Sequence, residues 1–320
     1  ALTSVTRASV ETALAVAVRK ISAELRGPLP TRFAVIAMGR FGGHECGYAS
    51  DADVLFVHDP LPGYAEKQAA DAAHAVAVEL RRLLALPVPD PPLVVDSDLR
   101  PEGRQGPLVR TLAAYRGYYR RWSAPWEAQA LLRAEPVAGD AELGAEFTAM
   151  IAEFRYPPGR GADGIDAAAV REIRRIKARM EAERIPRGAD RALHVKLGPG
   201  GLSDVEWTVQ LLQLRYAHAL PGLRTTRTGA AMTAAVQAGL LPAHDAVALM
   251  SAWELAGRIR NAVVLVGGRP ADTLPTRHTE ATAVARLLGY PPGGAAQALE
   301  QDYRRAARRA RTVMEPLFYG

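Results

Sequence analysis

The chain has 320 residues, of which 48% are hydrophobic and 23% charged, and its formal net charge is +6. This composition is typical of a soluble globular protein with room for two domains. No apolar run reaches the roughly 18 residues of a membrane span, so we expect no membrane partner. The single cysteine, Cys46, excludes an intramolecular disulfide. Together with the lack of a secretory signal, it favours a cytoplasmic location.

The basic residues are scattered through the second half and do not gather with aromatic residues in one segment. Such gathering is typical of nucleic-acid-binding grooves, so we expect no nucleic-acid partner. A positive net charge suits anionic small molecules and acidic protein surfaces as well.

Hydrophobic periodicity predicts a mixture of helices and strands in the first half of the chain. Stretches rich in glycine and proline separate these elements. In chain order we expect a helix over 4–26, strands over 33–38 and 52–57, a helix over 64–86, a strand over 93–96, helices over 112–121 and 125–132, a strand over 133–137, and a helix over 140–154.

The segment Tyr156–Gly161 is rich in proline and glycine, and we place a domain boundary near residue 160. The segments beyond it have helical spacing and short connections, which predicts a bundle of antiparallel helices. These helices are expected over 166–184, 202–220, 229–239, 243–266, 279–288 and 294–318. The predicted organisation is an α+β domain over residues 1–160, followed by an all-α helical bundle over residues 161–320.

Two carboxylates stand where the second predicted strand begins: Asp53 lies near its start, and Asp51 lies just before it. Side chains two positions apart on a strand share a face, so we expect these two to converge. A divalent cation is the usual remedy for the resulting repulsion. In the preceding loop, the paired glycines Gly42 and Gly43 let backbone N–H groups approach a phosphate closely. This combination is typical of nucleotidyl transfer. The alternative is a β-hairpin with an acidic, solvated turn.

The string G-R-F-G-G-x-E-x-x-Y-x-S-D-x-D over 39–53 resembles the nucleotidyltransferase motif of the glutamine synthetase adenylyltransferases, members of the polymerase-β-like superfamily. Three other segments, 95–103, 122–134 and 194–207, also resemble this family, as does the closing segment Val313–Phe318. The bifunctional enzyme of the family has two such halves. One half attaches AMP to a tyrosine of glutamine synthetase, and the other removes it by phosphorolysis.

The resemblance implies ATP as substrate and a site for two Mg²⁺ ions, with Asp51, Asp53 and Asp96 as the catalytic metal ligands. Asp96 matches the acid in the family pattern V-D-x-R-L-R-P-x-G. Asp98 departs from that pattern, because many members have arginine there. It is either an extra ligand, an ion-pair partner for a nearby arginine, or a surface residue.

The resemblance further implies which residues contact the triphosphate and which support the site. Some have structural alternatives, as ion-pair partners, packing residues or helix-stabilising acids. The expected phosphate contacts are Gly42, Gly43, Ser50, Arg100, Arg104 and Lys196, and the expected supporting residues are Asp98, Glu127, Arg133, Asp204 and Glu206.

The expected reaction is attack of a glutamine synthetase tyrosine hydroxyl on the α-phosphate of ATP, which releases pyrophosphate and down-regulates nitrogen assimilation. The closing segment resembles the natural C-terminus of the bifunctional enzyme, so we expect the adenylylating half of a longer chain. The alternatives are the deadenylylating half, which releases ADP, a non-catalytic module that binds nucleotide or a PII-type signal protein, and a polymerase-like nucleotidyltransferase acting on RNA or a small molecule.

Overall fold

The computed structural model describes residues 1–87, 92–157 and 164–320. The chain groups into two compact units, one formed by Ala1–Cys46 and Ser50–Pro157, the other by Gly47–Ala49 and Pro158–Gly320. The predicted boundary near residue 160 lies outside the described residues. No helix in the described part of the chain is long and apolar enough to cross a membrane.

The first unit contains a small mixed sheet and six α-helices among its described residues, and most of its elements start and end close to their predicted positions. One expectation is wrong: the glycine-containing segment after the first strand was expected to be a loop, but it forms a helical turn. Its elements are α1 (Leu2–Leu25), β1 (Thr31–Ala37), α2 (Gly39–Gly42), β2 (Ala52–Pro60), α3 (Glu66–Leu84), β3 (Val95–Asp96), β4 (Val109–Thr111), α4 (Leu112–Trp122), α5 (Pro125–Leu131), β5 (Glu135–Gly139) and α6 (Ala141–Arg155).

The sheet has the strand order β3-β2-β1-β5. β1 lies antiparallel to both β2 and β5, whereas β2 lies parallel to β3 and to β4. The two short strands share one edge of β2, because β3 pairs with its first residues and β4 with Phe56–His58. The start of β2 is therefore next to the end of β3.

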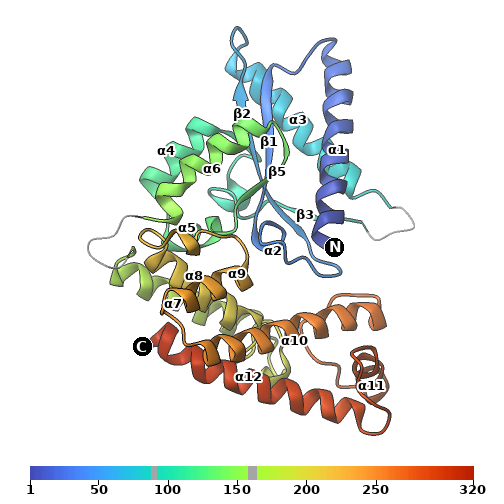
Figure 1. The fold of residues 1–320 in the computed structure, drawn as a ribbon. Coiled ribbons are helices and arrows are strands. Elements are labelled where there is room, and N and C mark those ends of the chain that lie inside the picture. The colour runs from blue at the N-terminus through green and yellow to red at the C-terminus, as the bar shows by residue number, and fades with distance from the viewer. Residues whose placement is uncertain (88–91, 158–163) are drawn as a thin grey trace. The chain divides into compact units, whose positions relative to one another are not determined.

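Helices cover both faces of this sheet (Figure 1). Alternate residues of β1 and β2 point to opposite sides, as the pleat of a strand requires. On one side, Val35 and Val54 pack with apolar residues of α1 and α3. On the other side, Ile36 and Leu55 pack with α4, α5 and α6. Both faces are buried, which explains why these strands are almost continuously apolar.

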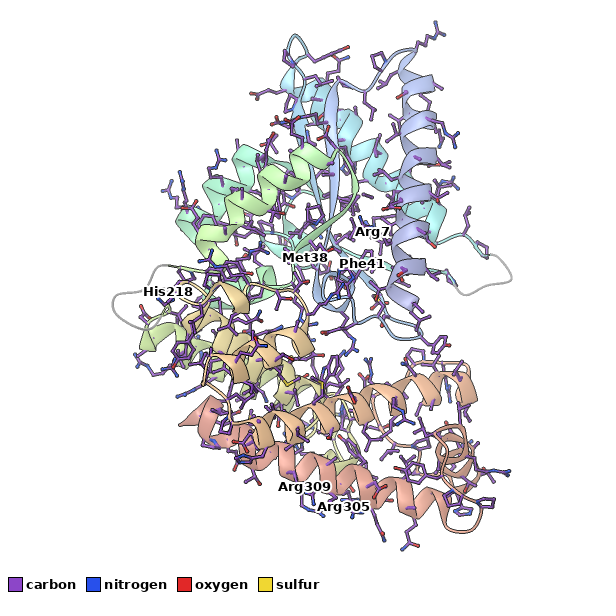
Figure 2. All side chains as sticks on the ribbon, viewed as in Figure 1. Arg7, Met38, Phe41, His218, Arg305 and Arg309 are labelled. Atoms are coloured by element: carbon purple, nitrogen blue, oxygen red, sulfur yellow. The ribbon has the colours of Figure 1, made fainter. Side chains whose placement is uncertain are left out.

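The second unit consists of helices around an apolar core that joins α8, α10, α11 and α12. The predicted helices all form, with ends shifted by a few residues. They are α7 (Ala167–Arg184), α8 (Leu202–Tyr216), α9 (Thr228–Gln237), α10 (Ala243–Gly267), α11 (His278–Leu287) and α12 (Ala295–Tyr319). Arg305 and Arg309 are both carried by α12 (Figure 2), and Arg305 pairs with Asp302 on the same helix.

Candidate functional site

The short helix α2 is anchored to both cores of the first unit. Met38, just before it, packs into the core between the sheet and α4–α6, and Phe41 packs into the core on the α1 and α3 side. Each is only 1% exposed, and both are labelled in Figure 2. Two large buried side chains on opposite sides fix the turn that joins β1 to the loop carrying the acidic motif.

Gly39 lets this turn pass directly beside Asp53. It has a φ of +51°, in the left-handed region that glycine adopts without strain. A Cβ at this position would collide with the carboxylate of Asp53. The N–H of Met38 also donates to the carbonyl oxygen of Asp53 at 2.8 Å. The backbone of the turn therefore holds one of the predicted metal ligands in place.

Asp53 and Asp96 are brought together by strand pairing. They are direct register partners in the parallel pair of β2 and β3. Their neighbours Ala52 and Val95 both point into the core on the α1 and α3 side. Both carboxylates therefore point to the opposite face, and both are half-buried. Two half-buried carboxylates side by side form a site that favours cations.

Asp51 lies just before the strand, as expected. β2 begins at Ala52, and Asp51 is exposed in the preceding loop. Among residues 1–87, 92–157 and 164–320, no group of three or more His, Cys, Asp and Glu side chains is arranged to hold a metal ion. The pair of Asp53 and Asp96 is present, and the three-carboxylate metal site stays a prediction.

Gly42 and Gly43 do not form an open phosphate cradle in this conformation. The N–H of Gly42 donates to Met38 at 2.8 Å, and the N–H of Gly43 donates to Gly39 at 3.1 Å. A Cβ on Gly42 would collide with the carbonyl oxygen of Arg133 and lie 2.7 Å from that of Ala37. Glycine is needed here for close backbone packing. These two amides contact a phosphate only if the turn opens. Ser50, beyond the turn, is half-buried.

The loop after β3 is organised by Arg100. This buried guanidinium donates to the carbonyl oxygen of Ser97 at 2.8 Å and of Gly106 at 3.2 Å. Asp98 lies 3.6 Å from Arg100 and accepts from Arg104 at 2.7 Å. Of the three alternatives for Asp98, the structure shows the ion-pair partner. Arg100 is occupied within its own loop, whereas the side chain of Arg104 is 85% exposed.

A pocket of about 340 Å³ opens beside Asp96, and it shows one residue that sequence reasoning missed. Arg81, near the end of α3, lines the pocket together with Arg100 and Arg104. The charge of Asp98 raises the pKa of Arg104, chiefly through their hydrogen bond. Arg81 has no sequence signal of its own, because it belongs to an ordinary amphipathic helix outside the motifs.

Arg133 and Glu127 are both buried, and each is held by a neighbouring protein group. Arg133 donates to Glu45 at 2.5 Å, and both side chains are less than a tenth exposed. Glu127 accepts from the N–H of Ala124 at 2.8 Å, at the start of α5. Burial raises the pKa of Glu127, although bonds from Ala124 and Tyr118 oppose the rise. Glu45 is a second residue missed as a site residue, although it is the glutamate of the glycine motif.

The second motif lies in the other unit, and its acid is a centre of buried charge. Asp204 is 1% exposed and accepts from the N–H of Gly200 at 2.7 Å. It also forms ion pairs with Arg311 at 3.0 Å and with Lys177, which in turn pairs with Glu181. Burial acts to lower the pKa of Lys177, but Asp204 and Glu181 outweigh it and raise the pKa.

The other two predicted residues of this motif have weaker contacts. Lys196 is 45% exposed, and its Nζ lies 3.9 Å from Asp272 Oδ2. Glu206 accepts from the indole N–H of Trp253 at 3.2 Å. These contacts leave Lys196 accessible to solvent, whereas Asp204 serves the internal structure of its unit.

Two family models match this chain, one over the part that contains the motif at 39–53 and the other over the part that contains the motif at 194–207. Residues 1–150 match the family model of glutamate-ammonia ligase adenylyltransferase. Residues 174–318 match the family model described as GlnD PII-uridylyltransferase.

Relatives named "bifunctional glutamine synthetase adenylyltransferase/adenylyl-removing enzyme" cover nearly the whole chain. The one from Streptomyces coelicolor is 64% identical over 91% of this chain and 29% of its own length. Those from Nocardia farcinica and Mycobacterium avium are each 52% identical over 99% of this chain, which is 31% and 32% of their lengths. The chain thus spans about a third of these relatives or slightly less. Nearly the whole of this chain is therefore similar to one part of the bifunctional glutamine synthetase adenylyltransferase/adenylyl-removing enzymes.

Proposed function

We propose that this chain catalyses adenylyl transfer from ATP to a tyrosine hydroxyl of glutamine synthetase, with release of pyrophosphate. In this proposal, the first unit is a polymerase-β-like nucleotidyltransferase domain. The observation that carries the proposal is the register pairing of Asp53 with Asp96 directly beside the α2 turn. The names of the relatives support the same chemistry.

The carboxylate pair has the donor chemistry for Mg²⁺, since hard oxygen ligands are what this ion prefers. Asp53 and Asp96 would hold it, with Asp51 as the third acid from the adjoining loop. Bound Mg²⁺ would neutralise charge on the phosphates and activate the attacking hydroxyl. The chain itself keeps Asp53 in place through Gly39 and the N–H of Met38.

The test is labelling of purified glutamine synthetase by α-labelled ATP and Mg²⁺ in the presence of this chain. The Asp53→Asn and Asp96→Asn variants should lose about a thousandfold in rate, since several kcal/mol of charge stabilisation is removed. Asp59→Asn is the matched control, because Asp59 lies at the far end of β2 and pairs with Arg32. Equal labelling by all variants would contradict the proposal.

Adenylyl removal is the second candidate, because the relatives carry both activities in one name. The same carboxylate pair would serve phosphorolysis, in which a phosphate oxygen attacks the phosphorus of the AMP–tyrosine linkage, the bond to the tyrosine oxygen breaks, and ADP and the free tyrosine hydroxyl are formed. Incubating adenylylated glutamine synthetase with phosphate and this chain distinguishes the two directions by the appearance of ADP. If neither activity appears and ATP still binds, a non-catalytic nucleotide-binding module is the better description.

The second unit is proposed as the surface for protein partners. Its match to a PII-uridylyltransferase model supports recognition of a PII-type signal protein. Titration calorimetry of this chain with purified PII protein would test the interaction, and no heat change at millimolar concentrations would count against it.

A further inference from the structure

The segment between α2 and Asp51 is tied to the residues around β5 by two neighbouring polar pairs. Arg133 donates to Glu45 at 2.5 Å. Two residues further along, Glu135 forms a 2.7 Å contact with His44 Nε2. Two consecutive residues of the loop that leads to Asp51 thus contact two alternate residues at the beginning of β5.

The first pair is buried, whereas the second is partly exposed. The side chains of Arg133 and Glu45 are 6% and 7% exposed, and those of His44 and Glu135 are 30% and 29% exposed. A buried ion pair stabilises a fold no better than apolar residues of the same size, because desolvation offsets the attraction. What such a pair does supply is a fixed geometry.

The backbone around this pair is also locked. Glu45 donates its N–H to Arg40 at 2.8 Å and accepts from the Arg40 guanidinium at 2.9 Å. The carbonyl oxygen of Arg133 lies against Gly42, where a Cβ would not fit. One residue, Arg133, therefore fixes the α2 turn through its backbone and the following loop through its side chain.

The loop fixed in this way leads directly to the carboxylates. Cys46 follows Glu45, and its backbone N–H donates to Thr3 at 3.1 Å. Burial is the main reason that the pKa of the Cys46 thiol is raised, and the negative charge of Asp53 also raises it. A shift of this loop would therefore displace Asp51 and the entrance of β2.

We propose that Glu45 and Arg133 are a positioning pair, which sets the loop of residues 43–50 so that Asp51 and Asp53 hold the reacting groups in line. The inference rests on the proposed adenylyl transfer. Neither residue contacts the substrate in this scheme. Arg133 is expected from the sequence to support the site, and its ion pair with Glu45 specifies how it does so.

The test uses Glu45→Gln and Arg133→Gln, alone and combined, with Arg133→Lys as the conservative variant. Arg32→Gln is the matched control. It removes a half-buried arginine that pairs with Asp59 and Glu146 at the opposite end of the same β-hairpin. Thermal unfolding confirms that each variant is folded before it is assayed.

The first readout needs no enzyme activity. Cys46 is the only cysteine, so its reaction with dithiobis(nitrobenzoic acid) reports opening of this loop. We expect about tenfold faster labelling in Glu45→Gln and Arg133→Gln, because loss of the pair lets the loop open locally. Arg32→Gln should react at the wild-type rate, and Arg133→Lys should fall between.

The second readout is the split between kcat and KM. A misplaced loop should lower kcat by about 10- to 100-fold, since small displacements of reacting groups cost that much, while KM for ATP changes little. The double variant should be no slower than the slower single variant. Folded variants with wild-type kcat and labelling would overturn the inference, as would equal effects in Arg32→Gln.

The two readouts separate this inference from the proposed function. If the wild-type chain transfers no AMP in either direction while Cys46 labelling responds as expected, the proposed function fails and the pair still holds the loop. If AMP transfer occurs but the Glu45 and Arg133 variants keep the wild-type labelling rate and kcat, the positioning inference alone fails.

Discussion

Replacement of Asp204 by asparagine should strongly destabilise the second unit. Asparagine keeps the shape of the side chain and an oxygen for the N–H of Gly200, so the change removes mainly the charge. Lys177 is completely buried, and it would keep only Glu181 as a counter-ion. Arg311 would keep Glu315, which is 56% exposed. The variant thus leaves a buried cation partly uncompensated.

The expected loss of unfolding free energy is about 3 kcal/mol, the lower end of the range for breaking a buried pair, because Glu181 remains. In a unit of this size, that loss corresponds to a fall in Tm of about 6–12 °C. Differential scanning calorimetry of the full chain measures the shift. A Lys177→Met replacement in the Asp204→Asn background should recover part of it, because the uncompensated charge is gone.

Glu315→Gln is the control, since it removes an exposed partner of the same arginine and should cost less than about 1 kcal/mol. A Tm for Asp204→Asn within about 2 °C of wild type would refute the assignment of Asp204 as a centre of buried charge. So would an equal loss in Glu315→Gln.

The further predictions concern the first unit. Gly42→Ala should cost about 1–3 kcal/mol by overpacking and lower transfer activity, whereas Gly27→Ala, with nothing within 4 Å of its Cβ, should be neutral in calorimetry. Arg100→Ala should cost about 1–3 kcal/mol by leaving carbonyl oxygens unpaired. Arg104→Ala should leave Tm unchanged, and a raised KM for ATP in that variant would support its phosphate contact. Burial lowers the pKa of His58, so the unfolded chain binds more protons than the native chain below about pH 6.5. Stability should therefore be full above that pH and fall toward pH 5, and His58→Gln should flatten this fall in urea titrations; an unchanged slope would contradict it.

Most elements could be predicted because their patterns are local. Apolar runs identify β1 and β2, and helical spacing identifies α10 and α12, since both faces of the sheet and one side of each helix are buried. β4 has only three residues, too few to show an alternating hydrophobic pattern. It forms by pairing with the edge of β2. The α2 turn was missed because two glycines usually indicate a loop, whereas here burial of Phe41 stabilises a helical turn.

The candidate site was harder to predict than the fold, because its geometry depends on contacts between distant segments. Motif spacing identified Asp53 and Asp96, but only strand register places them side by side. Arg133 and Glu45 are 88 positions apart, and no local pattern pairs them. The choice between phosphate contact and structural partner for Arg100 depended on which carbonyl oxygens its loop presents.

The pairing of β1 with β5 has a consequence for how the first unit folds. Ala34 lies opposite Gly139, so the two strands that meet are about a hundred residues apart in sequence. Contacts at such separations form slowly, because a long loop must close first. Until β5 arrives during synthesis, one edge of β1 remains open to pairing with other chains. We expect refolding of this unit to be slow and sensitive to protein concentration, with β5 docking as the step that ends its exposure to aggregation.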